Sequence, residues 1–215
     1  MSKFKLALFD MDGTLLRDRT IFVFAEKKGF MDDLRRLIKN TNMEFYEKSI
    51  EIAKSLKGLD SKELLEIFRN MPLQKHAENV VKELKKKGIK TAIVTDGYQF
   101  VANDLKERLD MDYAFANNII IDKGIVTGEL IIHNKELIEE SVESNIYSIC
   151  KSCVLEQLCK ELDITSDEVI AVGDGKVDIC MLKKAGLGIA FNASAEVKKH
   201  ADISITNMSL ILNHI

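Results

Sequence analysis

The sequence predicts an α/β fold in which helices cover both faces of a largely parallel β-sheet. Two observations lead to this prediction. From residue 74 onward, short apolar runs of strand length alternate with amphipathic stretches of helix length, which is the pattern of parallel sheets. Residues 17–73 interrupt this alternation after the first strand with helical stretches only. We therefore expect an α/β core from residues 1–16 and 74–215, with an inserted all-helical cap at 17–73.

The composition is that of a folded globular chain without a nucleic-acid surface. The 215 residues suffice for one large domain or for a core with a small inserted one, and 46% of them are hydrophobic. A net charge of −3 gives no basic footprint for nucleic acid. No apolar run reaches the ~18 residues of a membrane span, and the apolar run after Lys5 is too short for a signal peptide. We expect a cytoplasmic protein with no nucleic-acid or membrane partner, and the oligomeric state stays open.

The first expected strand, Leu6–Phe9, runs directly into Asp10-Met11-Asp12-Gly13-Thr14. An apolar run of this length is typical of a buried strand, and ligands of open α/β sheets bind beyond the carboxyl ends of the strands. Two carboxylates so close together repel, and burying either of them unpaired is costly. A Mg²⁺ ion with water and phosphate as further ligands would relieve this repulsion. A turn with two surface acids uses the same residue types, so the other strand ends decide between the two interpretations.

The inserted block reads as four helices. They are expected at 21–28, 32–39, 44–56 and 61–69. Asn42 and Ser61 are the expected N-caps of the last two. Pro72, the only proline, marks the end of the block.

The core elements follow in alternation after residue 74. Apolar residues at the i, i+3, i+4, i+7 spacing from Ala77 to Leu84 predict a helix that Gly88 ends. The later elements are expected as strand 89–95, helix 100–109, strand 113–115, a hairpin over 119–126 with its turn at 122–124, helix 145–162, strand 169–172, helix 176–184, and strands 187–191 and 203–205.

Two further positions carry residues capable of chemistry. The second strand ends in Thr95-Asp96-Gly97, where a hydroxyl and a backbone approached closely through glycine can hold a phosphoryl oxygen. Lys151 lies near the start of a helical stretch. Taken singly, the first is an ordinary turn and the second an ordinary surface lysine.

A later strand ends in Gly173-Asp174-Gly175, followed by Asp178. Glycines on both sides of an acid weaken local structure and indicate close approach of the backbone to a ligand. Both acids suit a metal site that faces Asp10.

Cys150 and Cys153 form a C-x-x-C pair, a spacing found in redox and metal sites. The pair falls within an expected helix and no second C-x-x-C follows. We therefore expect reduced, structural thiols.

Four segments of the chain resemble, in order, the four motifs of the haloacid dehalogenase superfamily, and the resemblance covers essentially the whole chain. They are the segments that carry Asp10 and Asp12, then Thr95, then Lys151, then Asp174 and Asp178. The segments Tyr113–Asn117, Thr127-Gly128 and Ala185–Phe191 are similar to the phosphoserine phosphatase branch. The resemblance implies a Rossmann-like core with a C1-type cap, and a phosphatase acting on a small phosphorylated metabolite through an aspartyl-phosphate. It implies Asp10 as nucleophile and Asp12 as general acid and base. It implies phosphate binding by Thr95, Asp96, Gly97 and Lys151, and a Mg²⁺ cofactor at Asp10, Asp12, Asp174 and Asp178, with Asp12 offering its backbone carbonyl.

The resemblance fails at positions that would recognise phosphoserine. An acid that would meet the substrate amine is replaced by Arg19, and a cap arginine that would grip its carboxylate is matched by Ile52. Asp96 stands where a glycine is expected and Val177 where an asparagine is expected. An arginine in place of an acid reverses the preference from ammonium to anion. We therefore assign Arg19 to substrate specificity and expect a phosphate ester other than phosphoserine.

Three alternatives remain. One is a genuine phosphoserine phosphatase, with Arg19 pointing to solvent. A receiver-type signalling domain uses similar residues, but its phosphoacceptor lies on a later strand and it lacks a helical insert. A degenerate binding protein is suggested only by Val177 and Asp96, against the retention of the other motif residues.

Overall fold

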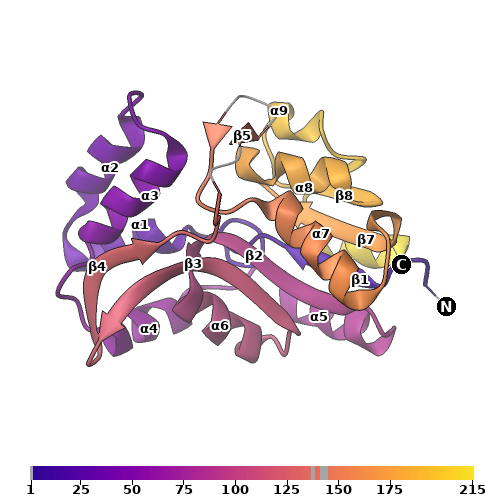
Figure 1. The fold of residues 1–215 in the computed structure, drawn as a ribbon. Coiled ribbons are helices and arrows are strands. Elements are labelled where there is room, and N and C mark those ends of the chain that lie inside the picture. The colour runs from indigo at the N-terminus through magenta and orange to yellow at the C-terminus, as the bar shows by residue number, and fades with distance from the viewer. Residues whose placement is uncertain (1, 137–138, 141–144) are drawn as a thin grey trace.

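The computed structural model describes residues 2–136, 139–140 and 145–215. A seven-stranded sheet in the order β4-β3-β2-β1-β7-β8-β9 forms its centre (Figure 1). All neighbouring strands pair in parallel except β3 and β4, which form an antiparallel hairpin at one edge. The strands are β1 Leu6–Phe9, β2 Lys90–Tyr98, β3 Tyr113–Asp122, β4 Ile125–Ile131, β7 Val169–Gly173, β8 Leu187–Phe191 and β9 Ile203–Ile205, with a separate pair of β5 Glu139–Glu140 and β6 Asn145–Ile146. The expected α/β fold class is confirmed.

Helices cover both faces of the sheet. α5 and α6 lie on one face, and α7 and α8 lie on the other (Figure 1). The core helices are α5 Ala77–Lys86, α6 Gln99–Arg108, α7 Lys151–Leu162, α8 Ile179–Lys184 and α9 Ala195–Lys198, with short 3₁₀ turns at Ser166–Glu168, Lys176–Asp178 and Met208–His214. None of the helices in the described part of the chain combines the length and apolarity needed to cross a bilayer.

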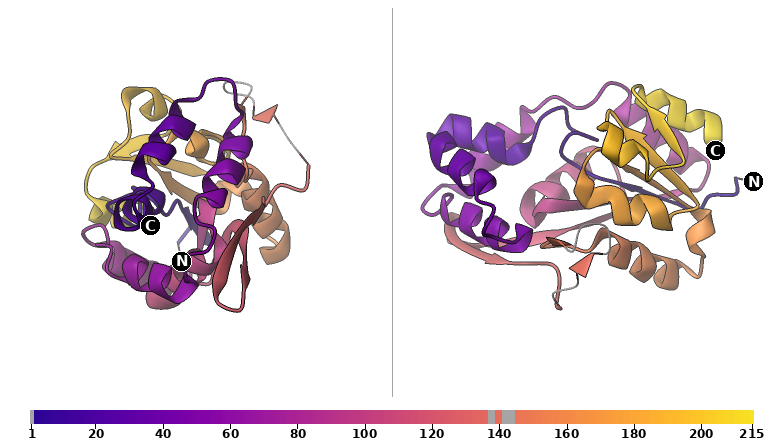
Figure 2. Two further views of the ribbon diagram at one scale, coloured as in Figure 1. Left: turned by 90° about the vertical axis from the view of Figure 1, so that its left-hand side faces the viewer. Right: turned by 90° about the horizontal axis from the view of Figure 1, so that it is seen from above.

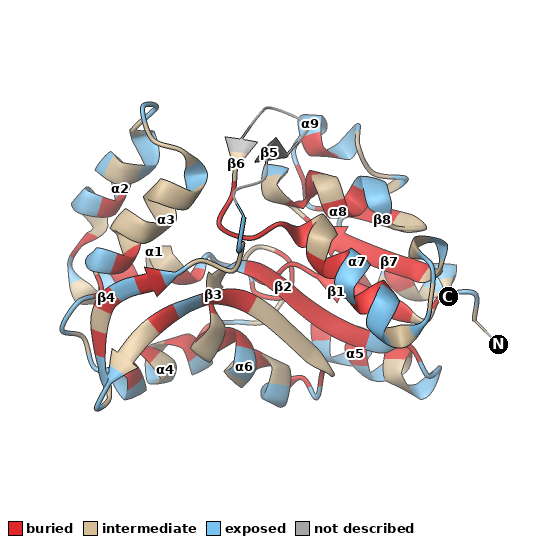
Figure 3. Ribbon diagram, in the orientation of Figure 1, coloured by how far each residue is buried: buried red, intermediate tan, exposed pale blue. Residues whose placement is uncertain are grey.

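The central strand β1 shows why the chain folds in this way. Leu6 and Leu8 belong to the hydrophobic cluster under α7 and α8, whereas Ala7 and Phe9 belong to the cluster under α5 and α6. All four residues are fully buried, and Figure 3 shows buried residues along the central strands. A strand covered on both faces needs a continuous apolar run rather than alternation, which is the pattern at residues 6–9.

Four helices lie at one end of the molecule, beyond the first strand (Figure 2). They are α1 Thr20–Lys28, α2 Met31–Lys39, α3 Phe45–Lys54 and α4 Ser61–Arg69. The chain between α3 and α4 is hydrogen-bonded to the hairpin: Gly58 N–H donates to the Val126 carbonyl (2.8 Å) and Val126 N–H donates to the Leu59 carbonyl (2.9 Å). We propose residues 17–73 as the bounds of the cap. The β3–β4 hairpin extends from the core and is hydrogen-bonded to this cap.

Several local predictions were wrong. Glu44, not Asn42, is the N-cap of α3. It forms a reciprocal capping box with Glu47, whose carboxylate accepts the Glu44 N–H. Asp60, not Ser61, caps α4, because its carboxylate accepts hydrogen bonds from the N–H groups of Lys62 (2.7 Å) and Glu63 (3.1 Å).

Two longer segments also differ from the prediction. β3 continues from Tyr113 to Asp122 without a break into the hairpin, although a short strand at 113–115 was expected. The helix expected at 145–162 begins only at Lys151, because β6 occupies Asn145–Ile146 and residues 147–150 form an irregular segment with a bend. Apolar residues occur in both conformations, so periodicity alone did not separate strand from helix here.

Cys150 and Cys153 form a disulfide with their Cα atoms 5.2 Å apart. The expectation of reduced thiols is therefore wrong for this pair. Cys150 is the N-cap of α7 and Cys153 lies in its first turn, where residues three apart share one side of a helix. Lys151, the first residue of α7, therefore lies in the chain between the two bonded cysteines.

Candidate active site

The candidate active site lies where the carboxyl ends of three neighbouring strands meet. Phe9 is in register with Ile93 of β2 on one side and with Val172 of β7 on the other. Asp10, which follows Phe9, donates its N–H to the Val172 carbonyl at 2.9 Å. The end of β1 is therefore fixed beside the loop that carries Asp174.

Lys151 lies at the centre of this cluster and is fully buried. Its ammonium donates to Asp10 Oδ1 at 2.5 Å and to Asp178 Oδ1 at 2.6 Å. Burial by itself lowers the pKa of Lys151, but the two carboxylates outweigh it and raise the pKa above its ordinary value. A buried charge of this kind persists only with partners, so this lysine is not an ordinary surface residue.

Carboxylate oxygens of Asp10, Asp174 and Asp178 all lie within 4.8 Å of one another. Burial, together with the neighbouring acids, raises the pKa of Asp10 well above its usual range despite the ammonium of Lys151. Asp178 is already engaged, since its Oδ2 accepts the N–H groups of Asp174 (3.0 Å) and Gly175 (2.9 Å). Crowded carboxylates, two of them buried, fit a hard divalent cation. Asp178 accepts two backbone N–H groups, so Asp10 and Asp174 have more oxygen lone pairs left for such an ion.

Gly13 keeps the first loop close to this cluster. Its φ is +87°, and a Cβ there would lie 2.6 Å from Asp174 Oδ2. Only glycine adopts this conformation without a clash.

The side chain of Asp12 contacts Thr20 and not the acid cluster. Its carboxylate accepts a hydrogen bond from the Thr20 hydroxyl at 2.6 Å. Burial raises the pKa of Asp12 to about 7, although the hydrogen bond from Thr20 lowers it. The Asp12 side chain is therefore outside the acid cluster, and only its backbone is available for the predicted metal role.

The predicted phosphate-binding residues sit at an irregular part of β2. The register of the β2–β3 pairing shifts between Val94 and Tyr98, which releases backbone groups of Thr95 to Gly97 from the ladder. Thr95 is fully buried, and its Oγ1 accepts the Gly97 N–H at 3.1 Å. Asp96 is exposed at the edge of the site.

Arg19 reaches the acid cluster from the start of the cap. Its Nη2 lies 3.9 Å from Asp174 Oδ2, and its side chain is 59% exposed. Burial lowers the pKa of Arg19, but the surrounding acids, led by Asp174, raise it overall. Arg19 is therefore a cation that lies between Asp174 and the cap.

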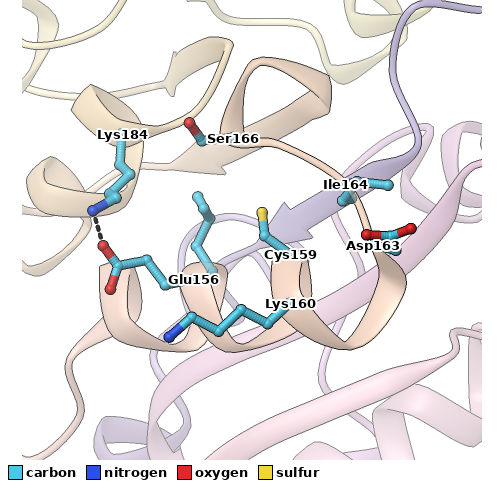
Figure 4. A pocket seen from close by; sticks show the side chains of 8 residues that line it. Glu156, Cys159, Lys160, Asp163, Ile164, Ser166 and Lys184 are labelled. Carbon is cyan, nitrogen blue, oxygen red and sulfur yellow. Dashed lines mark hydrogen bonds and ion pairs between the residues drawn. The ribbon is translucent and has the colours of Figure 1, made fainter.

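A cavity of about 470 Å³ joins these groups to the cap helices. Asp10, Asp12, Arg19, Asp96 and Asp174 all line it, so it gives the acid cluster access to a ligand. A second hollow, of about 520 Å³, lies between α7 and α8, where Glu156 pairs with Lys184 (Figure 4). Its lining shares no residue with the acid cluster.

Three polar residues of the site were not predicted. Thr14 donates its hydroxyl to Asp174 Oδ1 (3.2 Å), and Thr20 donates to Asp12. Asn117 is fully buried, and its Nδ2 donates to the Asp96 carbonyl (2.7 Å) and to Ser148 Oγ (2.8 Å). The Asp-x-Asp-Gly-Thr run could have indicated Thr14, but no local pattern marks Asn117.

The chain is similar to known proteins in sequence and in fold. The haloacid dehalogenase-like hydrolase family matches residues 7–183. The phosphoserine phosphatase of Methanocaldococcus jannaschii is 34% identical over 99% of this chain and 98% of its own length. That of Archaeoglobus fulgidus is 35% identical over 96% of this chain and 58% of its own length.

Solved structures show the same likeness. A phosphoserine phosphatase determined as a phospho-aspartyl intermediate analogue has a TM-score of 0.83 and 34% identity, with both chains covered completely. A substrate-bound phosphoserine phosphatase complex has a TM-score of 0.84 and 33% identity, again over both complete chains. The chain therefore belongs to the haloacid dehalogenase-like hydrolases and is a phosphatase of the phosphoserine phosphatase-like branch.

Proposed function

We propose that this phosphatase hydrolyses a small phosphomonoester with Mg²⁺, through an aspartyl-phosphate formed on Asp10. The observation that carries the proposal is the buried contact of Lys151 with both Asp10 and Asp178, beside the oxygens of Asp174. Gathering one ammonium and three carboxylates in a largely buried place is costly for stability, and the excess negative charge suits a divalent cation. That cation and Lys151 together would offset the charge of a dianionic phosphate.

In the first half-reaction, an Asp10 carboxylate oxygen bonds to phosphorus while the bond from phosphorus to the ester oxygen breaks. Lys151 and the Thr95 hydroxyl hold the phosphoryl oxygens and offset their charge, and the Gly97 N–H positions that hydroxyl by donating to its oxygen. Mg²⁺, held by Asp10, Asp174 and the Asp12 backbone carbonyl, would supply further positive charge at the phosphate. Repulsion between the dianion and the attacking carboxylate is thereby reduced.

Asp12 moves the protons. A pKa of about 7 leaves a large fraction of Asp12 protonated near neutral pH, so it can donate a proton to the departing ester oxygen. The ionised Asp12 then takes a proton from water, whose oxygen bonds to the phosphorus of the aspartyl-phosphate while the bond from phosphorus to the Asp10 oxygen breaks. Phosphate leaves, and both aspartates return to their starting states.

The substrate we propose carries an anionic or polyhydroxylated leaving group rather than an ammonium group. Arg19 lines the cavity as a cation, and Ile52 lines it without a charge. Phosphoserine itself is a second candidate substrate, because the similar proteins of Methanocaldococcus jannaschii and Archaeoglobus fulgidus are phosphoserine phosphatases. L-phosphoserine is therefore a necessary member of any substrate panel.

The nucleophile is tested with Asp10→Asn. We expect this variant to keep its fold and to lose turnover of p-nitrophenyl phosphate and alkyl phosphates, because the amide does not form the phosphoenzyme. EDTA should abolish turnover by the unmodified protein, and added Mg²⁺ should restore it. Released phosphate is the measurement, and Asp122→Asn, at the exposed end of β3, is the matched control. Full activity in Asp10→Asn or in EDTA would contradict the proposal.

A further inference from the structure

The cap side of the cavity is mainly apolar. Five large apolar cap residues line it, and they are Ile21, Phe22, Ile38, Phe45 and Ile52. The polar cap residues of the lining are Arg19, Lys48 and Ser49. Every cap residue from 17 to 73 is described, and the cap adds no acid to this wall.

Part of this apolar wall is exposed. Ile38 is 41% exposed and Phe45 is 40% exposed, and both side chains line the cavity. Burying these side chains in the cap core would have stabilised the protein. Exposed apolar residues gathered in a concave site indicate contact with a ligand.

An aromatic pair forms the part of the wall nearest the core. The rings of Phe45 and Tyr147 lie with their centroids 4.8 Å apart and their planes at 33°. Ser49, one turn after Phe45, lies with its Oγ 3.4 Å from Ser148 Oγ, so α3 contacts the core segment that carries Tyr147. The pair joins cap and core, with Phe45 40% exposed and Tyr147 7% exposed.

We propose that the leaving group of the preferred substrate, besides the anionic group that Arg19 favours, carries an apolar body, an alkyl chain or an aromatic ring, which packs against Phe45 and Tyr147. This inference rests on the proposed phosphomonoester hydrolysis and specifies its substrate class. An ester such as phosphoserine brings an ammonium group toward the cations Arg19 and Lys48, and leaves the wall uncovered. Like charges close together repel, so Arg19 and Lys48 disfavour an ammonium group on the cap side of the cavity.

A series of methyl, ethyl, propyl and butyl phosphates tests the inference, because their leaving groups differ mainly in length. We expect kcat/KM to rise about fourfold for each added methylene. L-phosphoserine should be turned over at least about tenfold less efficiently than propyl phosphate, which follows from two methylenes of lost contact. Calorimetric binding of the same esters to Asp10→Asn provides a readout that does not depend on turnover, and should show the same rise.

Phe45→Ala should flatten the series to less than about twofold per methylene, whereas Phe45→Leu should retain most of the rise. Ile38→Ala gives the same test if Phe45→Ala does not fold. The matched control is Ile131→Ala, which removes a 54% exposed side chain on β4 outside the cavity lining.

A flat series in both turnover and binding would overturn the inference, as would phosphoserine turnover equal to that of propyl phosphate. If the series is flat while Asp10→Asn loses all turnover, only this inference fails. If Asp10→Asn retains turnover, the proposed function fails, and the binding series still decides whether the apolar wall recognises the leaving group.

Discussion

At the scale of single residues, Asp10 and Asp12 differ in what surrounds their carboxyl groups. Asp10 accepts a hydrogen bond from the ammonium of Lys151, whereas Asp12 accepts one from the neutral hydroxyl of Thr20. The Lys151 ammonium favours the ionised form of Asp10, although burial and the neighbouring acids still raise the pKa of Asp10 above its usual range. Burial raises the pKa of Asp12 to about 7. Two acids only two positions apart are thereby suited to different roles.

Asp12→Asn should slow hydrolysis by about 10²–10⁴-fold with alkyl phosphates, because their alkoxide leaving groups need a proton. The loss should be smaller for the first step with p-nitrophenyl phosphate, whose leaving group departs as an anion. Rapid-quench measurement of phosphoenzyme formation with both esters checks this. Equal loss for the two leaving groups would mean that Asp12 acts otherwise, for example by positioning the metal.

Arg19→Gln should lower kcat/KM for phosphoglycolate, which carries a carboxylate, more than for ethyl phosphate. The side chain is 59% exposed, so we expect the difference to be only about fivefold, as for a solvent-screened ion pair. Arg17→Gln is the matched control, since Arg17 donates to the Leu73 carbonyl and is not in the cavity lining. The same loss for both esters would show that Arg19 acts through Asp174 rather than on the leaving group.

At the scale of elements, α7 connects an unusual cysteine pair to the central lysine. The helix begins at Lys151, Cys150 is its N-cap, and the disulfide to Cys153 closes its first turn. The Cys150 N–H also donates to Asn134 Oδ1 at 2.6 Å. The first turn of α7 is therefore held from two directions, which limits the positions open to Lys151.

Cys153→Ser should lower the free energy of unfolding by about 2 kcal/mol, the chain-entropy estimate for so short a loop. Urea unfolding measures the change. Dithiothreitol should lower the stability of the unmodified protein by a similar amount and leave that of Cys153→Ser unchanged. An unmodified protein that is equally stable with and without dithiothreitol would contradict the structural role of this disulfide.

At the scale of the whole molecule, cap and core share one hydrophobic cluster. Phe24 and Phe68 of the cap belong to the same cluster as Phe9 and Val101 of the core. The cap is also bonded through its backbone to the hairpin, where Ser61 N–H donates to the Gly124 carbonyl at 2.8 Å. The two parts therefore stabilise each other.

We expect a single unfolding transition in urea, with circular dichroism and tyrosine fluorescence giving the same midpoint. Phe68→Ala should move both curves together and cost about 3–5 kcal/mol, since Phe68 is fully buried. Ile131→Ala, at an exposed site, should change the midpoint little. Two separate transitions would show that the cap unfolds independently.

The sequence by itself determined the strands at residues 6–9, 187–191 and 203–205, and the polar residues that follow the strands. These features depend on apolar runs and turn residues that are local in the chain. The order of the strand ends was sufficient to predict that Asp10 and Asp174 would meet, because parallel strands bring their carboxyl ends to one edge.

Only the tertiary structure decided which groups touch. The contact of Asn117 with the Asp96 carbonyl spans 21 positions, and that of Thr14 with Asp174 spans 160. The apolar wall at Phe45 and Tyr147 likewise joins segments of cap and core. Such contacts depend on how distant segments pack, and on the requirement that polar groups buried by this packing find hydrogen-bond partners. No local pattern in the chain carries that information.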